Sequence, residues 1–136
     1  MLHIPIEEFS TPSPMVADVG ESIRAVSAMM KECEVRHVPI VESGKVVGIV
    51  SERNINAVIN VEGGEHVPVG QIMVRDPYTV MWNEPLEKVA FNMSKRKIGS
   101  AIVVNETNTP VGIFTSTDAL NALIEVIRGE MADYDE

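Results

Sequence analysis

An internal repeat constrains this sequence more than any other feature. The stretch from Ser13, SPMVADVGESIRAVSAMMKECEVRHVPIV, aligns with the stretch from Asp76, DPYTVMWNEPLEKVAFNMSKRKIGSAIVV, at an offset of about 63 positions. One extra residue then moves the offset to about 64, which places VGIVSERN from Val47 over VGIFTSTD from Val111. A chain that repeats one supersecondary unit is expected to fold into two similar halves.

Each half has the same order of predicted elements. A short extended segment follows a proline, and then come an amphipathic helix, two apolar strands joined by a turn, and a second helix over about 52–60 or 116–128. This order predicts a mixed α/β (α+β) fold. Its expected divisions are 1–62 (N-terminal segment and first repeat), 63–70 (Gly-rich linker), 71–129 (second repeat) and 130–136 (acidic tail).

Composition argues against several classes of partner. The 136 residues carry a net charge of −9, which nucleic-acid phosphates repel, so no nucleic-acid partner is expected. The sequence has no long apolar run, no recognisable leader and a single cysteine, Cys33. We therefore expect a cytoplasmic protein with no membrane contact and no disulfide, and with Cys33 buried in the first helix.

The residue patterns of catalysis and metal binding are also missing from the sequence. His3, His37 and His66 lie far apart, and no His-Glu-x-x-His spacing occurs, so no metal site is predicted. No activated nucleophile or convincing acid–base pair is recognisable either. We expect no catalytic residues and no cofactor, and hence a protein that is not an enzyme.

Both halves end their second apolar strand with a hydroxyl residue three positions before Asp or Asn. The pair is Ser51 and Asn54 in the first half and Thr115 and Asp118 in the second. This spacing fits a capping box, in which the side chains satisfy free backbone amides at a helix start. It also fits a nucleotide site, because a helix N-terminus attracts phosphate and a carboxylate accepts both hydroxyls of a ribose. The two roles are compatible, and both stay open here.

With these endings, the βαββα order and the apolar strands after RHVP and IGSA, the chain resembles a tandem pair of cystathionine β-synthase (CBS) domains, a Bateman module. The resemblance covers about Thr11 to Ile127. It implies two pseudo-symmetric repeats packed as a disk, with clefts for an adenosine-containing ligand such as AMP, ADP, ATP, S-adenosylmethionine or NAD. It also implies a homodimer formed through exposed helix faces, and a regulatory action on an effector protein.

The resemblance assigns candidate ligand contacts by position. In the second half it implies Asp118 at the ribose and Thr115 at the phosphate, with Thr79, Val80, Ser100 and Ala101 near the base and the strand edge. The corresponding residues of the first half are Val16, Ala17, His37, Val38, Ser51 and Asn54. Core packing is the alternative interpretation of the strand positions.

The first half departs from the family pattern at Asn54. An amide carries no charge and has one acceptor oxygen where the family has the two oxygens of Asp, so a weakened or vacant first site is expected. Arg53 lies in the first turn of a helix, where a cation opposes the helix dipole unless an anion compensates it. Bound phosphate is one such anion, and Glu52 or a carboxylate on a neighbouring loop is the other.

Two functions follow as hypotheses. The first is a stand-alone regulatory module that senses an adenosine-containing nucleotide in the cleft between two CBS repeats. The alternative is a ligand-free, dimerising interaction module that regulates a partner protein. Asn54 and an expected scarcity of cations around both clefts favour the alternative.

Overall fold

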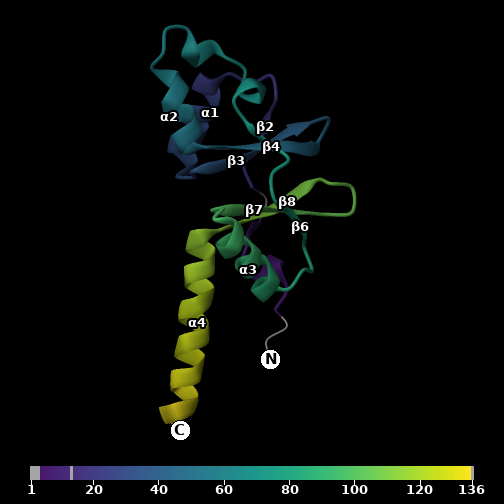
Figure 1. Cartoon of the computed structure of the whole chain (residues 1–136), viewed down its shortest axis with the longest axis vertical. Helices are drawn as coiled ribbons and strands as arrows, with labels where there is room; N and C mark the ends of the chain where they lie inside the picture. The colour runs from purple at the N-terminus through teal and green to yellow at the C-terminus, as the bar shows by residue number, and fades with distance from the viewer. Residues whose placement is uncertain (1–3, 13, 136) are drawn as a thin grey trace.

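The computed structural model describes residues 4–12 and 14–135, with side chains up to Gly129. Two four-stranded sheets face each other, and helices cover their outer faces (Figure 1). The first half holds β2 (Ala17–Asp18), α1 (Ile23–Cys33), β3 (His37–Glu42), β4 (Lys45–Ser51) and α2 (Glu52–Ile59). The second holds β6 (Thr79–Met81), α3 (Leu86–Arg96), β7 (Ser100–Val104), β8 (Pro110–Thr115) and α4 (Ser116–Asp135). The predicted duplicated α+β fold is confirmed.

The ends of the first helix in each half follow from local sequence. The side chain of Ser22 caps α1 by accepting a hydrogen bond from a backbone N–H at 3.1 Å. Both helices end in a left-handed residue, Glu34 at φ 55° and Lys97 at φ 56°. The N–H groups of Val35 and Ile98 then donate back into the last helical turn, each at 3.0 Å. The two halves therefore turn from helix to strand in the same way.

Side chains alternate between the two faces of each strand, so the core has separate parts on the two sides of a sheet. In β7, Ala101 and Val103 face the core under α3. Ile102 and Val104 face the opposite way and pack with Val46 of β4, between the two sheets. This inter-sheet cluster joins the two halves through apolar contacts, which are the main stabilising contribution in a buried interface.

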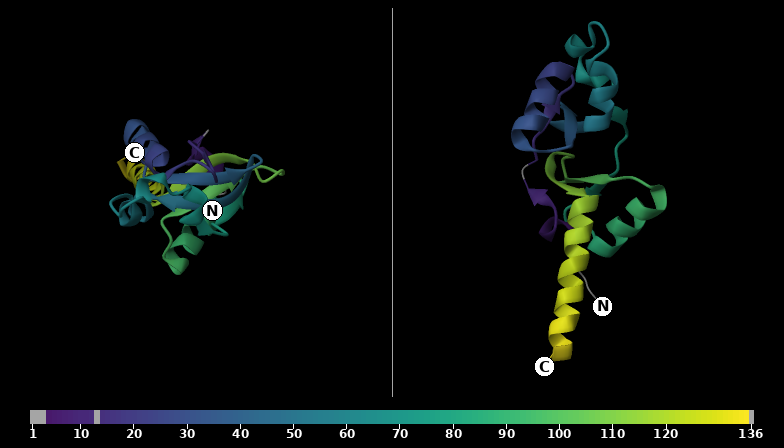
Figure 2. Two further views of the ribbon diagram at one scale, coloured as in Figure 1. Left: turned by 90° about the horizontal axis from the view of Figure 1, so that it is seen from above. Right: turned by 90° about the vertical axis from the view of Figure 1, so that its left-hand side faces the viewer.

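The two halves exchange the segments that lead into them. β1 (Thr11–Pro12) precedes the first half in sequence, yet it pairs with β8 of the second. β5 (Val74–Arg75) precedes the second half, yet it pairs with β4 of the first. Figure 2 shows the N-terminal segment, in purple, against the second half. Each sheet is therefore completed by chain from outside its own repeat.

The exchange reveals a part of the repeat that the sequence predictions missed. Ile6 and Val69 are both fully buried, the first in the core of the second half and the second in the core of the first half. The N–H of Ile6 donates to the carbonyl of Glu84 at 2.7 Å. The N–H of Val69 donates to the carbonyl of Glu21, also at 2.7 Å. The similar sequences HIPI, from position 3, and HVPV, from position 66, could have identified this part of the repeat. The segment 63–70, interpreted as a linker, thus includes part of the core of the first half.

The lead-in strands β5 and β1, which pair beside Gly48 and Gly112, explain the glycine in VGI of both halves. A Cβ added to Gly48 would overlap the side chain of Met73 and lie 3.0 Å from the carbonyl oxygen of Val74. A Cβ added to Gly112 would lie 2.9 Å from Oγ of Ser10. A side chain at Gly48 or Gly112 would therefore crowd the edge strand that pairs with it, β5 or β1.

We expect Gly48→Ala to lower the free energy of unfolding by about 1–3 kcal/mol, because the new methyl group overpacks the β4–β5 contact. Urea unfolding measures this loss. Gly129→Ala is the matched control, since nothing lies within 4 Å of a Cβ at this helical position. That change should raise stability by up to about 1 kcal/mol. Equal stability of Gly48→Ala and wild type would contradict the close approach.

Two further sequence expectations differ from the structure. Cys33 is exposed, so the prediction of a buried thiol was wrong; it is the last residue of α1, and the buried stripe of that helix ends at Met30. α4 continues to Asp135, past the expected end near Arg128. No helix in the described part of the chain is long and apolar enough to cross a bilayer. The same residues hold no cluster of His, Cys, Asp and Glu suited to a metal ion.

Candidate ligand site at the strand–helix junctions

Two equivalent junctions between a strand and a helix bring many of the candidate residues together. In the second half, Ser100 at the start of β7 is the pairing partner of Thr115 at the end of β8. In the first half, His37 of β3 is the partner of Ser51 at the end of β4. A helix begins directly after each of these hydroxyl residues. Each junction therefore combines a strand edge with the free amides of a helix start.

Thr115 and Asp118 form a capping box at the start of α4. The N–H and the hydroxyl of Thr115 donate to Oδ2 of Asp118 at 2.8 and 3.1 Å. The N–H of Asp118 donates weakly to the Thr115 hydroxyl at 3.4 Å. Oδ1 of Asp118 has no hydrogen-bond partner among the described residues. One carboxylate oxygen thus caps the helix, and the other is free to accept a hydrogen bond.

Ser51 and Asn54 form the same box at the start of α2. The N–H and the hydroxyl of Ser51 both donate to Oδ1 of Asn54 at 2.9 Å, and the N–H of Asn54 donates to Ser51 Oγ at 3.1 Å. The amide has only one oxygen, so its remaining polar atom is an NH₂ group that donates. The first junction therefore offers a donor where the second offers an acceptor.

The candidate residues on the strands divide by burial. Four of them, Ala17, Val38, Val80 and Ala101, have side chains packed in the cores under the helices. For these side chains the core-packing interpretation is correct, and only their backbone groups are available to a ligand. Val16 and Thr79 are exposed, while His37 and Ser100 are half-buried. The accessible candidates thus lie at the ends of the strands.

Arg53 is exposed and has no ion-pair partner among the described residues. Glu52 pairs with Arg36 instead, with 3.9 Å between Oε2 and Nε. The prediction that Glu52 compensates the charge of Arg53 was therefore wrong. Because the side chains of Arg36 and Glu52 are 84% and 55% exposed, their pair contributes at most about 1 kcal/mol. The first turn of α2 keeps a cation that is available to an anion.

His37 lies at the first junction with its pKa lowered from 6.5 by burial and, secondarily, by the positive charge of Arg36. Both causes disfavour the imidazolium in the folded protein. The sign of the linkage follows: the unfolded chain binds the proton more readily, so this contribution to stability is present above pH 6.5 and is lost as pH falls through the folded pKa.

We therefore expect the wild type to lose more unfolding free energy than His37→Gln when the pH falls from about 7.5 to about 5.5, a range above the ordinary pKa of carboxylates. Urea unfolding of both proteins at the two pH values measures the difference. Parallel losses in the two proteins would show that His37 does not contribute.

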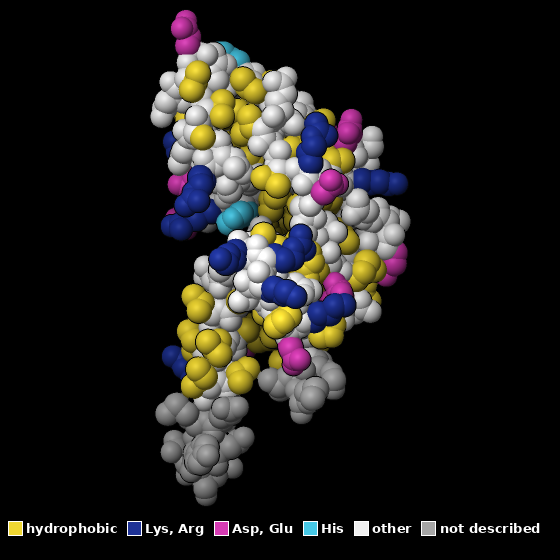
Figure 3. All heavy atoms as spheres, in the orientation of Figure 1, with side chains coloured by type: hydrophobic (Ala, Val, Ile, Leu, Met, Phe, Trp, Pro, Cys, Tyr) yellow, Lys and Arg dark blue, Asp and Glu magenta, His cyan; other side chains and the backbone are white. Residues whose placement is uncertain are grey.

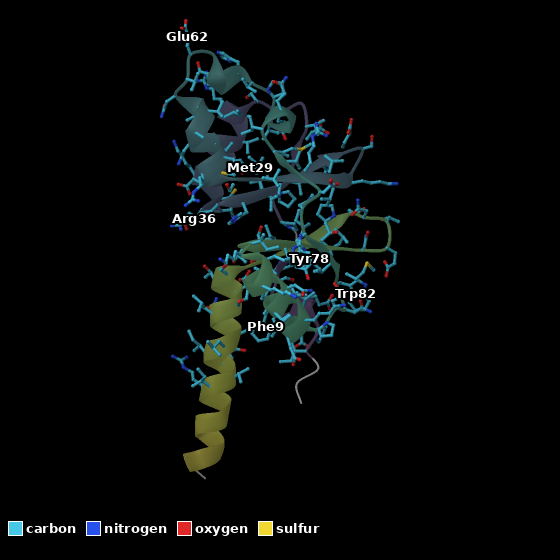
Figure 4. The ribbon with its side chains drawn as sticks, viewed as in Figure 1. Phe9, Met29, Arg36, Glu62, Tyr78 and Trp82 are labelled. Carbon is cyan, nitrogen blue, oxygen red and sulfur yellow. The ribbon has the colours of Figure 1, made fainter. Side chains whose placement is uncertain are left out.

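Cationic side chains gather around the gap between the halves. Figure 3 shows a notch there, with Lys and Arg side chains on both sides. Figure 4 places Arg36 at the upper edge of this gap and Tyr78 on its lower side. The expected scarcity of cations was therefore wrong for this face. A net charge of −9 for the whole chain does not determine how the charges are distributed.

Tyr78 is a candidate that the sequence predictions missed. The guanidinium carbon of Arg96 lies 4.8 Å from the centroid of its ring, and Nδ2 of Asn92 donates to its hydroxyl at 3.0 Å. These contacts hold an aromatic ring directly before Thr79. Its position beside an expected base contact was the signal that could have identified it.

The family follows from comparison with known proteins. The family model of the CBS domain matches residues 6–60 and 69–125, so the chain belongs to the CBS domain family and contains two of its domains. The structure of a putative acetoin utilization protein (AcuB) from Vibrio cholerae is similar, with a TM-score of 0.84 and 28% identity over 96% of this chain and 98% of that chain. The CBS domain pair of protein MJ0100, solved in complex with 5′-methylthioadenosine and S-adenosyl-L-methionine, gives a TM-score of 0.81 and 28% identity. That match covers 90% of this chain and 97% of the other.

Relatives with enzyme names match over a small part of their length. L-aspartate semialdehyde sulfurtransferase from Methanocaldococcus jannaschii is 31% identical over 83% of this chain but 22% of its own length. Homoserine O-acetyltransferase from Methanococcoides burtonii is 30% identical over 91% of this chain and 25% of its own. This chain thus spans about a quarter of these relatives. CBS domain pairs are regulatory modules and generally not catalytic.

Proposed function

We propose that this CBS pair is a regulatory module that binds an adenosine-containing nucleotide at the junction of β7, β8 and α4. The observation that carries the proposal is Oδ1 of Asp118, an acceptor left over by the capping box beside the free amides of a helix start. The bound 5′-methylthioadenosine and S-adenosyl-L-methionine of the MJ0100 pair support this ligand class. AMP, ADP, ATP, S-adenosylmethionine and NAD are the candidates.

Each group of the junction has a distinct role in this proposal. Asp118 accepts hydrogen bonds from the ribose hydroxyls, while Thr115 and the first N–H groups of α4 contact the phosphate or its substitute. Thr79 and the backbone groups of Val80, Ser100 and Ala101 contact the base. The hydroxyl oxygen of Thr115 can still accept a hydrogen bond from a ligand while it takes part in the capping box, because a hydroxyl oxygen has two lone pairs.

The first junction is proposed as a different and weaker site. Asn54 offers a donor, which cannot accept from ribose hydroxyls. Arg53 and His37 at the same junction suit an anionic group, with Val16, Val38 and Ser51 as its other neighbours. A single strong site per chain is therefore the simplest form of the proposal.

Thermal unfolding with and without each of the five candidate ligands tests the proposal. A ligand at about 100 times its dissociation constant should add about 2.7 kcal/mol, which raises Tm by several degrees in a protein of this size. The ligand with the largest rise is identified as the preferred one. If no candidate raises Tm at millimolar concentration, the proposal fails.

The second candidate function is an interaction module without a nucleotide. Four exposed apolar side chains of α4 favour it, because such a surface suits contact with another protein: Leu120, Leu123, Ile124 and Ile127. In either case we propose a cytoplasmic protein that acts on a separate effector. The absence of any thermal shift, together with a stable oligomer, would favour this second function.

A further inference from the structure

The turns of the β3–β4 and β7–β8 hairpins differ in length. In the first half, β3 and β4 are joined by Ser43 and Gly44, which both have positive φ. In the second half, residues 105–109 join β7 to β8. The repeat offset grows from about 63 to about 64 between these strands, so the extra residue of the second half lies in this loop. The two hairpins are therefore equivalent in their strands but not in their turns.

Asn108, in this longer loop, forms hydrogen bonds with the first half. The N–H of Val46 donates to the carbonyl of Asn108 at 3.1 Å, and Nδ2 of Asn108 donates to the carbonyl of Val46 at 3.2 Å. Among the described residues, these are the only hydrogen bonds that join one hairpin to the other. Asn108 has a φ of 59°, a conformation that asparagine tolerates, and its side chain adds a donor that glycine lacks. We call these two bonds the Asn108 clasp.

The loop of the clasp is itself held in place within the second half. Oδ1 of Asn105 accepts hydrogen bonds from the N–H groups of Thr107 and Thr109 at 3.0 and 3.1 Å. Nε1 of Trp82 donates to Oε1 of Glu106 at 3.2 Å, which connects the loop to the residue that follows β6. The clasp therefore joins the first half to a loop whose shape is already fixed by the second half.

The clasp lies at the opposite end of the hairpins from the strand–helix junctions. The 6 residues of β8 lead from the loop to Thr115, and at about 3.3 Å per residue they separate the two ends by roughly 17–20 Å. Figure 1 shows the hairpin turns on one side of the molecule and the start of α4 on the other. The inter-sheet cluster includes Val46 and Val104, which lie near the turns. The halves are thus joined at the turn end, and the notch of Figure 3 opens at the junction end.

We propose that the Asn108 clasp fixes the angle between the two repeats and thereby sets the width of the notch at which the proposed nucleotide binds. This inference rests on the proposed function, and Asn108 acts in it as a positioning residue. Two bodies joined at one end pivot about that end, so a shift at the clasp is largest at the notch. The first half supplies the opposite wall of the notch, where Figure 4 shows Arg36. A site that already has its binding geometry binds more tightly, because the nucleotide does not have to order the two halves.

Nuclear magnetic resonance of the full chain without nucleotide tests the clasp itself. Asn108→Gly keeps a residue that adopts positive φ and removes only the side-chain bond to Val46. The N–H of Val46 should then exchange with solvent roughly 3- to 10-fold faster, as expected for the loss of one hydrogen bond. Residual dipolar couplings should show a changed orientation of the β3–β4 hairpin relative to the β7–β8 hairpin. Ser43→Gly is the matched control, because Ser43 has a φ of 53° in the other turn and has no hydrogen bond to the second half among the described residues.

Calorimetric titration with the nucleotide that raises Tm most tests the link to the ligand site. Asn108→Gly should raise the dissociation constant roughly 3- to 10-fold although residue 108 is remote from the junction, and Ser43→Gly should leave it unchanged. Circular dichroism establishes that both variants are folded. An unchanged orientation of the hairpins in Asn108→Gly would overturn the proposal, as would unchanged affinity or an equal loss of affinity in Ser43→Gly. If no nucleotide binds to the wild type, the positioning role fails together with the proposed function, and the ligand-free comparison then decides the clasp alone.

Discussion

Asp118→Asn should weaken nucleotide binding while leaving the fold almost unchanged. Asn54 shows why: an asparagine at this position makes the same capping box, with both Ser51 donors on its oxygen at 2.9 Å. The substitution therefore keeps the cap and replaces the spare acceptor oxygen by an NH₂ donor. Hydrogen bonds to a charged group contribute about 1.5–3 kcal/mol, so the dissociation constant should rise roughly 10- to 100-fold.

Isothermal titration calorimetry with the ligand that raised Tm most measures this change in affinity. Without ligand, the Tm of Asp118→Asn should stay close to that of the wild type, because the substitution removes only the modest attraction between the Asp118 charge and the helix dipole. Asp118→Ala should lose the cap as well, at a cost of about 1 kcal/mol. Unchanged affinity in Asp118→Asn would show that the carboxylate serves the helix alone.

Asn54→Asp is the reciprocal variant. It should give the first junction the spare acceptor that the second one has, and the binding stoichiometry should rise from one ligand per chain toward two. If the stoichiometry stays at one, features other than residue 54 set the affinity of the first junction. Together the two variants separate capping from binding at matched positions of the same chain.

Ile6→Ala should destabilise the protein by about 3 kcal/mol, within the range of about 2–5 kcal/mol for removing a buried isoleucine side chain. Ile6 is fully buried among core residues of the second half, including Val89 and Phe114, although it precedes the first half in sequence. A domain of this size has a total stability of about 5–15 kcal/mol, so this single residue carries a large fraction.

Urea unfolding followed by fluorescence of Trp82, the only tryptophan, measures the effect of Ile6→Ala. Trp82 reports on the right region, because its carbonyl accepts a hydrogen bond from the N–H of Glu7 at 3.2 Å. Glu7→Ala is the control: its side chain is exposed, and the change should alter stability by no more than about 0.5 kcal/mol. Equal midpoints for Ile6→Ala and wild type would mean that the N-terminal segment is not part of the core.

The sequence predicted which residues form the candidate site, but not whether their polar atoms are free to bind a ligand. The spacing of Thr115 and Asp118 predicted either a cap or a ligand contact, and the structure shows the cap together with an unused oxygen. That oxygen depends on a rotamer, which spacing does not specify. Tyr78 was missed because its role comes from Arg96 and Asn92, which approach it only in the folded chain.

The sequence by itself determined the duplication, the order of the elements and the residues at both strand–helix junctions. These features depend on periodicity and turn chemistry, which act over a few residues. Only the tertiary structure decided that β1 completes the sheet of the second half, that β5 completes the sheet of the first half, and that Gly48 and Gly112 pair with these strands. It also decided that α4 exposes apolar side chains. Those outcomes depend on which distant segments bury each other's apolar surface, and local patterns do not encode that choice.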